Sequence, residues 1–175
     1  MKLFFTVLCA ALFSYCAAAR EVADASGRTF DFDAPPTAAT VVPNISQEVY
    51  AIGAQDFLLG NSNYCTYPED AKLKPKLGGL LNPDYEKIAK AAPEIFLLPL
   101  SPTGRAIARR LESVGVRPFF LNPEGLENVA KDILLLGKVF FKDAAAEKIA
   151  RDFDAEIRDE RGRQTGRGRK ALFMF

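Results

Sequence analysis

The chain contains no histidine and no tryptophan among its 175 residues, and only three cysteines. Without histidine it has no imidazole to activate a serine or cysteine nucleophile, and it lacks a ligand that transition metals commonly recruit in proteins. The charge is nearly balanced, with 23 basic and 22 acidic residues, so we expect no bulk attraction to nucleic acid or to an anionic membrane. The composition therefore argues against nucleophilic catalysis, bare-metal binding and nucleic-acid binding.

Two motifs of enzymes are also missing from the sequence. No Gly-x-Ser-x-Gly nucleophile elbow occurs, and the pair Gly78-Gly79 is not followed by the lysine and threonine of a phosphate-binding loop. Hydrophobic residues make up 49% of the chain, which is typical of a globular protein with a real core. The sequence therefore predicts a folded protein that is not an enzyme and holds no cofactor or metal.

The first nineteen residues have the pattern of a secretory signal peptide. After a short basic start, residues 3–13 are almost entirely apolar, and residues 17–19 are alanines, the small side chains that signal peptidase requires. We therefore assign residues 1–19 to a cleaved signal peptide, which predicts a periplasmic protein whose mature chain begins at Arg20. A membrane anchor is the alternative, but the apolar run is shorter than the roughly 20 residues that span a bilayer.

The three cysteines bear on the same prediction. Lipoprotein processing would occur at Cys16, but the bulky Tyr15 stands where a small residue is expected. Cleavage after residue 19 would remove Cys9 and Cys16 and leave Cys65 alone. An odd cysteine in an exported chain indicates a thiol packed in a turn, or a bridge to a partner.

Residues 20–122 alternate short strands with helices. The polar and apolar alternation of residues 21–32 predicts a small hairpin. Further strands are expected at residues 40–42, 57–60, 95–98 and 118–121. Strands that alternate with helices over short connections are typical of an α/β lobe, a parallel sheet covered by helices on both faces.

Helix boundaries are predicted from capping residues and glycine stops. The first helix is expected to be capped by Asn44 or Ser46 and to end at Gly53, and the next to begin with Asn82 as its cap and Pro83 at its first position. The apolar faces of the second and third helices carry Tyr85, Ile88, Ala89 and Ala92, and then Ile107, Leu111 and Val114.

From residue 123 the pattern becomes purely helical, which predicts a helical inter-lobe connector over residues 123–168 with a bend between residues 137 and 143. Its two expected apolar stripes consist of Leu126, Val129, Ala130, Ile133 and Leu134, and of Ala146, Ile149, Ala150, Phe153 and Ile157. The basic, glycine-rich residues 161–170 are interpreted as a solvated connector. Residues 169–175 are predicted to form the first strand of a second α/β lobe that the chain lacks, so we expect the sequence to be truncated.

Residues 63–98 contain the most specific sequence motifs of the chain. They contain a Tyr64-x-x-Tyr67-Pro68 turn, then Asn-Pro-Asp-Tyr-Glu-Lys-Ile at 82–88, then Pro-Glu-Ile-Phe-Leu-Leu at 93–98. In this order and spacing, and with the opening GRTFDFDAPPTAATVVPNISQEVYAIGA at 27–54, the chain resembles the first half of periplasmic binding proteins of the cobalamin and ferric-siderophore type. The resemblance implies two α/β lobes joined by a long helix, with the ligand held between them.

In such proteins the loops at the carboxyl ends of the strands face the ligand, in agreement with the general rule for parallel sheets. The residues that the resemblance nominates for ligand binding are Pro43, Asn44, Tyr64, Leu80, Leu81, Pro99 and Ser101. Tyr64 offers a flat ring to a corrin or chelate and a hydroxyl as a polar handle, although a turn residue that covers the core would have the same sequence. Leu80 and Leu81 are equally compatible with a place in the core.

Glu86 has a different implied role. In the family, a glutamate on this helix projects from the tip of the lobe and meets arginines of the membrane permease. The alternative is an acid that stabilises the first turn of a helix through the helix dipole. A pair of charges at the rim of an interface sets orientation and association rate more than affinity.

The resemblance predicts a monomeric solute-binding component of an ATP-driven importer that captures cobalamin or a related corrinoid and delivers it to a permease and its ATPase. A ferric siderophore or haem is the alternative ligand. An exported α/β enzyme with most of its active site in the missing half is the alternative of another class. Since one lobe cannot close on a ligand, we expect the 175-residue chain to bind weakly or not at all.

Overall fold

The structure is a computed structural model that describes residues 19–122 and 124–163. The predicted signal peptide, apart from its last residue, and the predicted final strand at residues 169–175 lie outside the described residues. Among the described residues, no helix is both long enough and apolar enough to cross a membrane.

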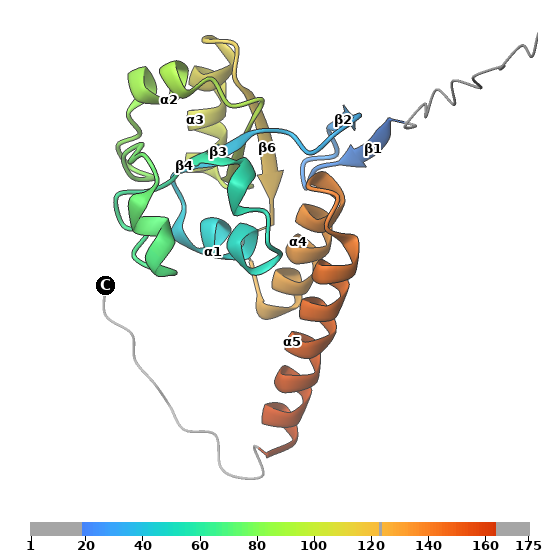
Figure 1. Cartoon of the computed structure of the whole chain (residues 1–175). Helices are drawn as coiled ribbons and strands as arrows, with labels where there is room; N and C mark the ends of the chain where they lie inside the picture. The colour runs from blue at the N-terminus through green and yellow to red at the C-terminus, as the bar shows by residue number, and fades with distance from the viewer. Residues whose placement is uncertain (1–18, 123, 164–175) are drawn as a thin grey trace, which may run out of the picture.

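A four-stranded parallel sheet forms the centre of the fold (Figure 1). Its strands are β3 (Ala38–Thr40), β4 (Leu58–Gly60), β5 (Ile95–Pro99) and β6 (Arg117–Leu121). They are arranged in the order β4-β3-β5-β6, and each neighbouring pair is parallel. The predicted α/β fold with a parallel sheet is confirmed, and the predicted first strand at 40–42 is placed two residues too late.

The described residues form five α-helices, of which the first four pack around the sheet and the fifth packs against the fourth. They are α1 (Pro43–Ala51), α2 (Tyr85–Ala91), α3 (Pro102–Glu112), α4 (Leu126–Val139) and α5 (Asp143–Arg163). Short 3-10 helices cover Gln55–Phe57 and Glu69–Leu73. The predicted hairpin is confirmed as β1 (Arg20–Ala23) paired antiparallel with β2 (Thr29–Phe32).

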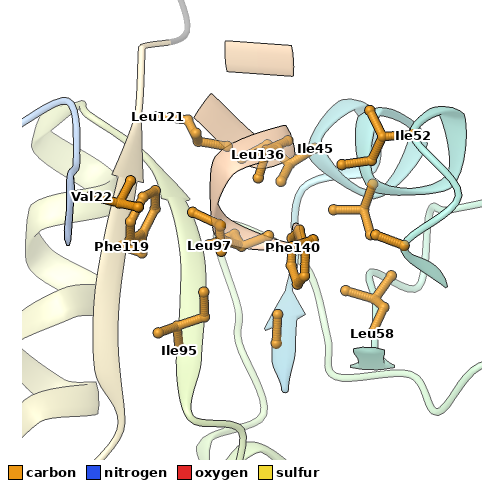
Figure 2. Packing of buried hydrophobic residues seen from close by; sticks show 14 of the residues in the cluster. Val22, Ile45, Ile52, Leu58, Ile95, Leu97, Phe119, Leu121, Leu136 and Phe140 are labelled. Carbon is orange, nitrogen blue, oxygen red and sulfur yellow. The ribbon is translucent and has the colours of Figure 1, made fainter. Parts of the chain in front are cut away.

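The two faces of the sheet bury two separate apolar cores, because successive side chains of a strand point to opposite faces. In β5, Ile95 and Leu97 face a core shared with α1, α4 and the hairpin (Figure 2), and Phe96 and Leu98 face a core shared with α2 and α3. All five residues of β5 are buried, as expected for a parallel strand covered on both sides.

Helices α4 and α5 form an antiparallel pair, joined by the turn at residues 140–142 (Figure 1). A Cβ atom at Gly137 would collide with the Cβ of Ala146, so glycine lets the two helices approach closely. Arg20 ties this turn to the hairpin, since its guanidinium lies 2.7 Å from the Asp143 carboxylate and 4.3 Å from the centre of the Phe141 ring. Helix α5 then continues beyond the start of α4 (Figure 1).

Two predicted helix starts are wrong. Asn82 does not cap α2, because its backbone N–H and C=O are both bonded to Gly79, and the cap is instead Asp84, whose carboxylate accepts from the Lys87 N–H at 3.1 Å. Helix α1 begins at Pro43 directly after Val42, with no side-chain cap from Asn44 or Ser46. Helix α2 thus starts at a side-chain cap two residues after the predicted one, and α1 starts without a side-chain cap.

The predicted apolar faces are correct for α5 and partly wrong elsewhere. In α5 the stripe lies toward α4, with Ala146 and Ala150 fully buried. In α4 the buried apolar side chains are those of Ala130, Ile133, Leu136 and Val139, whereas Leu126 and Leu134 are exposed. Ala89, Ala92 and Val114 are also exposed.

Candidate ligand-binding site

The order of the strands defines where a ligand site is expected. From β3 the chain first goes to β4 on one side and then crosses to β5 on the other, so the direction of winding reverses between β3 and β5. In open α/β sheets, ligands bind at the carboxyl ends of the strands at such a switch point. The segments after Thr40 and after Pro99 meet at this edge.

A cavity of about 180 Å³ lies at this edge, between the sheet, α1 and α4. Its walls come from Val42, Asn44, Ile45, Leu80, Pro99, Leu121 and Asp132. Three residues predicted from the sequence are thereby brought together, namely Asn44, Leu80 and Pro99. Small-molecule sites usually enclose roughly 300 Å³ or more, so this cavity fits one group of a larger ligand and not a whole corrinoid or chelate.

The turn from β3 into α1 is held against β5 by a buried hydroxyl. The Oγ1 atom of Thr40 donates to the Leu97 carbonyl at 2.9 Å and accepts from the Val42 N–H at 3.2 Å. These two bonds fix the direction in which Pro43 and Asn44 leave the sheet. Asn44 therefore lies at the exposed mouth of the cavity, at the start of α1.

Sequence reasoning missed one carboxyl group in the cavity wall, Asp132, and a second one near it, Glu48, which does not line the cavity. Asp132 projects from α4, is 7% exposed, and accepts from the Asn122 N–H at 3.1 Å. Burial raises the pKa of Asp132 to about 6. Burial, followed by the proximity of Asp132, raises the pKa of Glu48 to about 8, against a smaller opposing effect of a hydrogen bond from the Asn44 side chain. An aspartate inside the apolar stripe of α4 was the available signal for this pair.

Tyr64 lies beside the cavity-forming loop without lining the cavity. Its side chain is 70% exposed, and a Cβ atom at Gly79 would lie 2.8 Å from its Cε2 atom, so the ring covers the backbone of Gly79. Asn63 fixes this contact, because its N–H donates to the Gly78 carbonyl at 2.9 Å and its Oδ1 accepts from the Gly78 N–H at 3.3 Å. Gly78 has a φ of +93°, which favours glycine. Leu81, in the same loop, is exposed and does not line the cavity.

The aromatic turn that carries Tyr64 is held by a lysine. The Nζ atom of Lys76 donates to Asn61 Oδ1 at 2.8 Å, to the Ala71 carbonyl at 3.0 Å and to the Cys65 carbonyl at 3.2 Å. Cys65 is buried in this turn as a free thiol, with its Sγ 3.6 Å from the Tyr67 carbonyl. This agrees with the prediction of a thiol packed in a turn.

Three other nominated residues lie outside the cavity lining. Ser101 caps α3, since its Oγ accepts from the Gly104 N–H at 3.1 Å, and Pro43 occupies the first position of α1. Glu86 is exposed in the first turn of α2, away from the lining residues. Within the described ranges, no group of three or more acidic or cysteine side chains is placed to hold a metal ion.

Residues 39–175 match a family described as periplasmic binding protein. The chain belongs to this family. The resemblance seen in the sequence is confirmed, and the cavity lies on the edge of the lobe where the resemblance places the ligand.

Curated substrate-binding proteins are about a quarter identical to this chain over the aligned residues. A vitamin B12-binding protein of Yersinia pestis is 24% identical over 132 residues, which cover 75% of this chain and 47% of the relative. An uncharacterized ABC transporter substrate-binding lipoprotein of Bacillus subtilis, YvrC, is 23% identical over 129 residues, which cover 71% of this chain and 40% of the relative. The chain thus spans less than half the length of these relatives.

Solved periplasmic binding proteins share the fold. The vitamin B12 binding protein of Vibrio cholerae has a TM-score of 0.67 and 23% identity, over 74% of this chain and 51% of that one. A siderophore binding protein, BauB, has a TM-score of 0.71 and 19% identity, over 85% and 55%. A heme binding protein of Pseudomonas aeruginosa has a TM-score of 0.65 and 22% identity, over 73% and 46%. At these identities the matches establish the fold alone.

Proposed function

We propose that this protein is an extracytoplasmic solute-binding component of an ATP-driven importer, and that it captures cobalamin or a related corrinoid. The observation that carries the proposal is the cavity at the switch point, which Asn44, Leu80 and Pro99 line together. The vitamin B12-binding relatives support the corrinoid, and the signal-peptide pattern supports a periplasmic location. Because the lipoprotein of Bacillus subtilis is among the relatives, lipid attachment at Cys16 is the alternative route to the same side of the membrane.

In this proposal the cavity takes one edge of the ligand, while Tyr64 and Leu81 meet the ligand outside it. Both side chains are exposed on the segments that border Leu80 and Gly79. An exposed aromatic ring and an exposed leucine next to a concave apolar surface suit a large ligand with a flat face.

Glu86 is proposed to dock the protein on the permease. It stands exposed at the start of α2, on the opposite face of the sheet from α1 and α4. A carboxylate placed there can meet a basic partner without competing with a ligand in the cavity. We propose that the protein acts as a monomer in this complex.

A ferric siderophore or haem is the second candidate ligand, supported by the siderophore and heme binding proteins that share the fold. An exported enzyme has less support, because the named solved structures are all described as binding proteins.

Equilibrium dialysis of the protein against cyanocobalamin, haem and a ferric hydroxamate siderophore tests the proposed ligand. Because one lobe cannot close on a ligand, we expect weak but saturable retention of cyanocobalamin. Retention of the other two is expected to be weaker again by about tenfold or more, which corresponds to about 1.4 kcal/mol. Retention of haem or the siderophore without retention of cyanocobalamin would replace the corrinoid by the second candidate.

A pair of leucine variants shows whether the retained ligand is in the cavity. Leu80→Asp places a carboxylate in the apolar wall and is expected to abolish retention of cyanocobalamin. Leu73→Asp makes the same change on a leucine that is 84% exposed and outside the lining, and is expected to leave retention unchanged. Equal effects of the two variants would show that the ligand binds elsewhere.

A further inference from the structure

The cavity is mostly apolar, and its one charged lining residue is acidic. Five of its seven lining residues are apolar, and the polar ones are the Asn44 amide at the mouth and the Asp132 carboxylate. No lysine or arginine is among the lining residues. The cavity therefore offers a carboxylate to an incoming group and no positive charge.

A second carboxyl group, that of Glu48, lies near Asp132 and Asn44 but outside the lining of the cavity. Glu48 follows Asn44 by one turn of α1, and its Oε2 atom is buried with no hydrogen-bond partner among the described residues. The charge of the preceding residue, Lys131, acts to lower the pKa of Asp132. The Lys131 side chain is exposed and donates to Asn128 Oδ1 at 3.1 Å. Neither carboxyl group has an ion-pair partner within 4.0 Å in the part of the chain that the structure describes.

We infer that Asp132 makes this cavity select a ligand group that donates hydrogen bonds and carries no negative charge, such as a primary carboxamide. The inference rests on the proposed function and adds the chemistry by which the site discriminates. A carboxamide N–H₂ can donate to Asp132 and share the Asn44 amide at the mouth, with its carbon chain against Leu80 and Pro99. A carboxylate in the same place would face Asp132 in a partly desolvated space, and juxtaposed like charges weaken binding.

This chemistry separates the two candidate ligand classes. The corrin ring of cobalamin bears carboxamide chains on its periphery, whereas the periphery of haem bears propionate carboxylates. A cavity of about 180 Å³ has room for one such chain. Asp132 is thus a specificity-determining residue that favours the amide-bearing ligand.

The test compares cyanocobalamin with its monocarboxylic acid derivatives, in which one peripheral amide is hydrolysed to a carboxylate. Each is titrated into the ¹⁵N-labelled protein at pH 7.5, and dissociation constants are obtained from amide chemical shifts. We expect at least one carboxylate derivative to bind about tenfold or more weakly than cyanocobalamin, because its charge falls at Asp132. In Asp132→Asn this difference is expected to shrink to less than about threefold.

Two further variants complete the test. The carboxamide oxygen of Asp132→Asn can still accept from the Asn122 N–H, so we expect the fold to be retained. Asn44→Asp adds a negative charge at the start of α1, where the helix dipole favours it, and is expected to widen the difference between the two ligands. Asp31→Asn removes a negative charge from an exposed position in β2 and is expected to leave the difference unchanged.

Each remaining outcome contradicts one part of the account. Equal affinity for cyanocobalamin and all its carboxylate derivatives would overturn the role of Asp132 while leaving corrinoid capture intact. A difference that persists undiminished in Asp132→Asn would do the same. Failure of the natural chain to bind any of these ligands would overturn the proposed function and the inference together.

Discussion

At pH 8, Glu48→Gln is expected to raise the free energy of unfolding by roughly 3 kcal/mol or more, and at pH 4.5 to leave it nearly unchanged. The reason is that burial and the neighbouring Asp132 raise the pKa of Glu48 from 4.5 to about 8. Between these two values the folded protein keeps a proton that the unfolded chain has released. The natural protein therefore loses stability as the pH rises through this window, by about 1.4 kcal/mol per pH unit.

Asp132 adds to the same trend at lower pH, since burial raises its pKa from 3.8 to about 6. A glutamine at position 48 has no proton to lose, so its unfolding free energy is expected to depend less on pH above about 6.

Urea unfolding at pH 4.5, 6, 7 and 8 measures both curves. Glu156→Gln, on the exposed side of α5, serves as the control and is expected to follow the natural protein at every pH. If the Glu48→Gln curve ran parallel to that of the natural protein, the carboxyl pair would not be buried as the structure describes.

Leu136→Ala is expected to lower the free energy of unfolding by about 2 to 5 kcal/mol. Leu136 is 0% exposed and lies in the core between the sheet, α1 and α4, so its truncation removes buried methyl groups and leaves a cavity (Figure 2). The effect would show that α4 is an integral part of the α/β lobe, since a helix that only connects two lobes would not contribute its core.

Leu134→Ala provides the matched control, since it makes the same change two residues earlier in the same helix. Leu134 is 37% exposed, and we expect its truncation to cost less than about 1 kcal/mol. Comparable losses for the two variants, measured by chemical denaturation, would contradict the placement of α4.

The sequence predicted the order of strands and helices because each β-branched or aromatic run is bounded by proline or glycine. It did not predict the start of α2, because the bonds between Asn82 and Gly79 form only when the chain folds back on itself. The predicted apolar stripe of α4 included Leu134, which is exposed, and omitted Leu136, which is buried. The two leucines cannot be told apart without knowing where the sheet lies.

The candidate site was predicted in part for the same reason. Asn44 follows β3 and Pro99 ends β5, and parallel strands bring their carboxyl ends to one edge, so their meeting was predictable. Asp132 lies on a helix that reaches this edge from a later part of the chain. Asp132 comes close to Glu48 only in the packed structure. The local sequence signal was limited to an acidic residue in an apolar stripe.

The central claim is that the cavity at the β3–β5 switch point is part of the ligand site. Titration of cyanocobalamin into the ¹⁵N-labelled protein, followed amide by amide, tests it most directly. The account predicts saturable shift changes centred on Asn44, Ile45, Leu80, Leu121 and Asp132. A separate groove lies between α2 and the segment that contains Pro75 and Leu77. Shift changes confined to that groove, with none at the cavity, would contradict the claim.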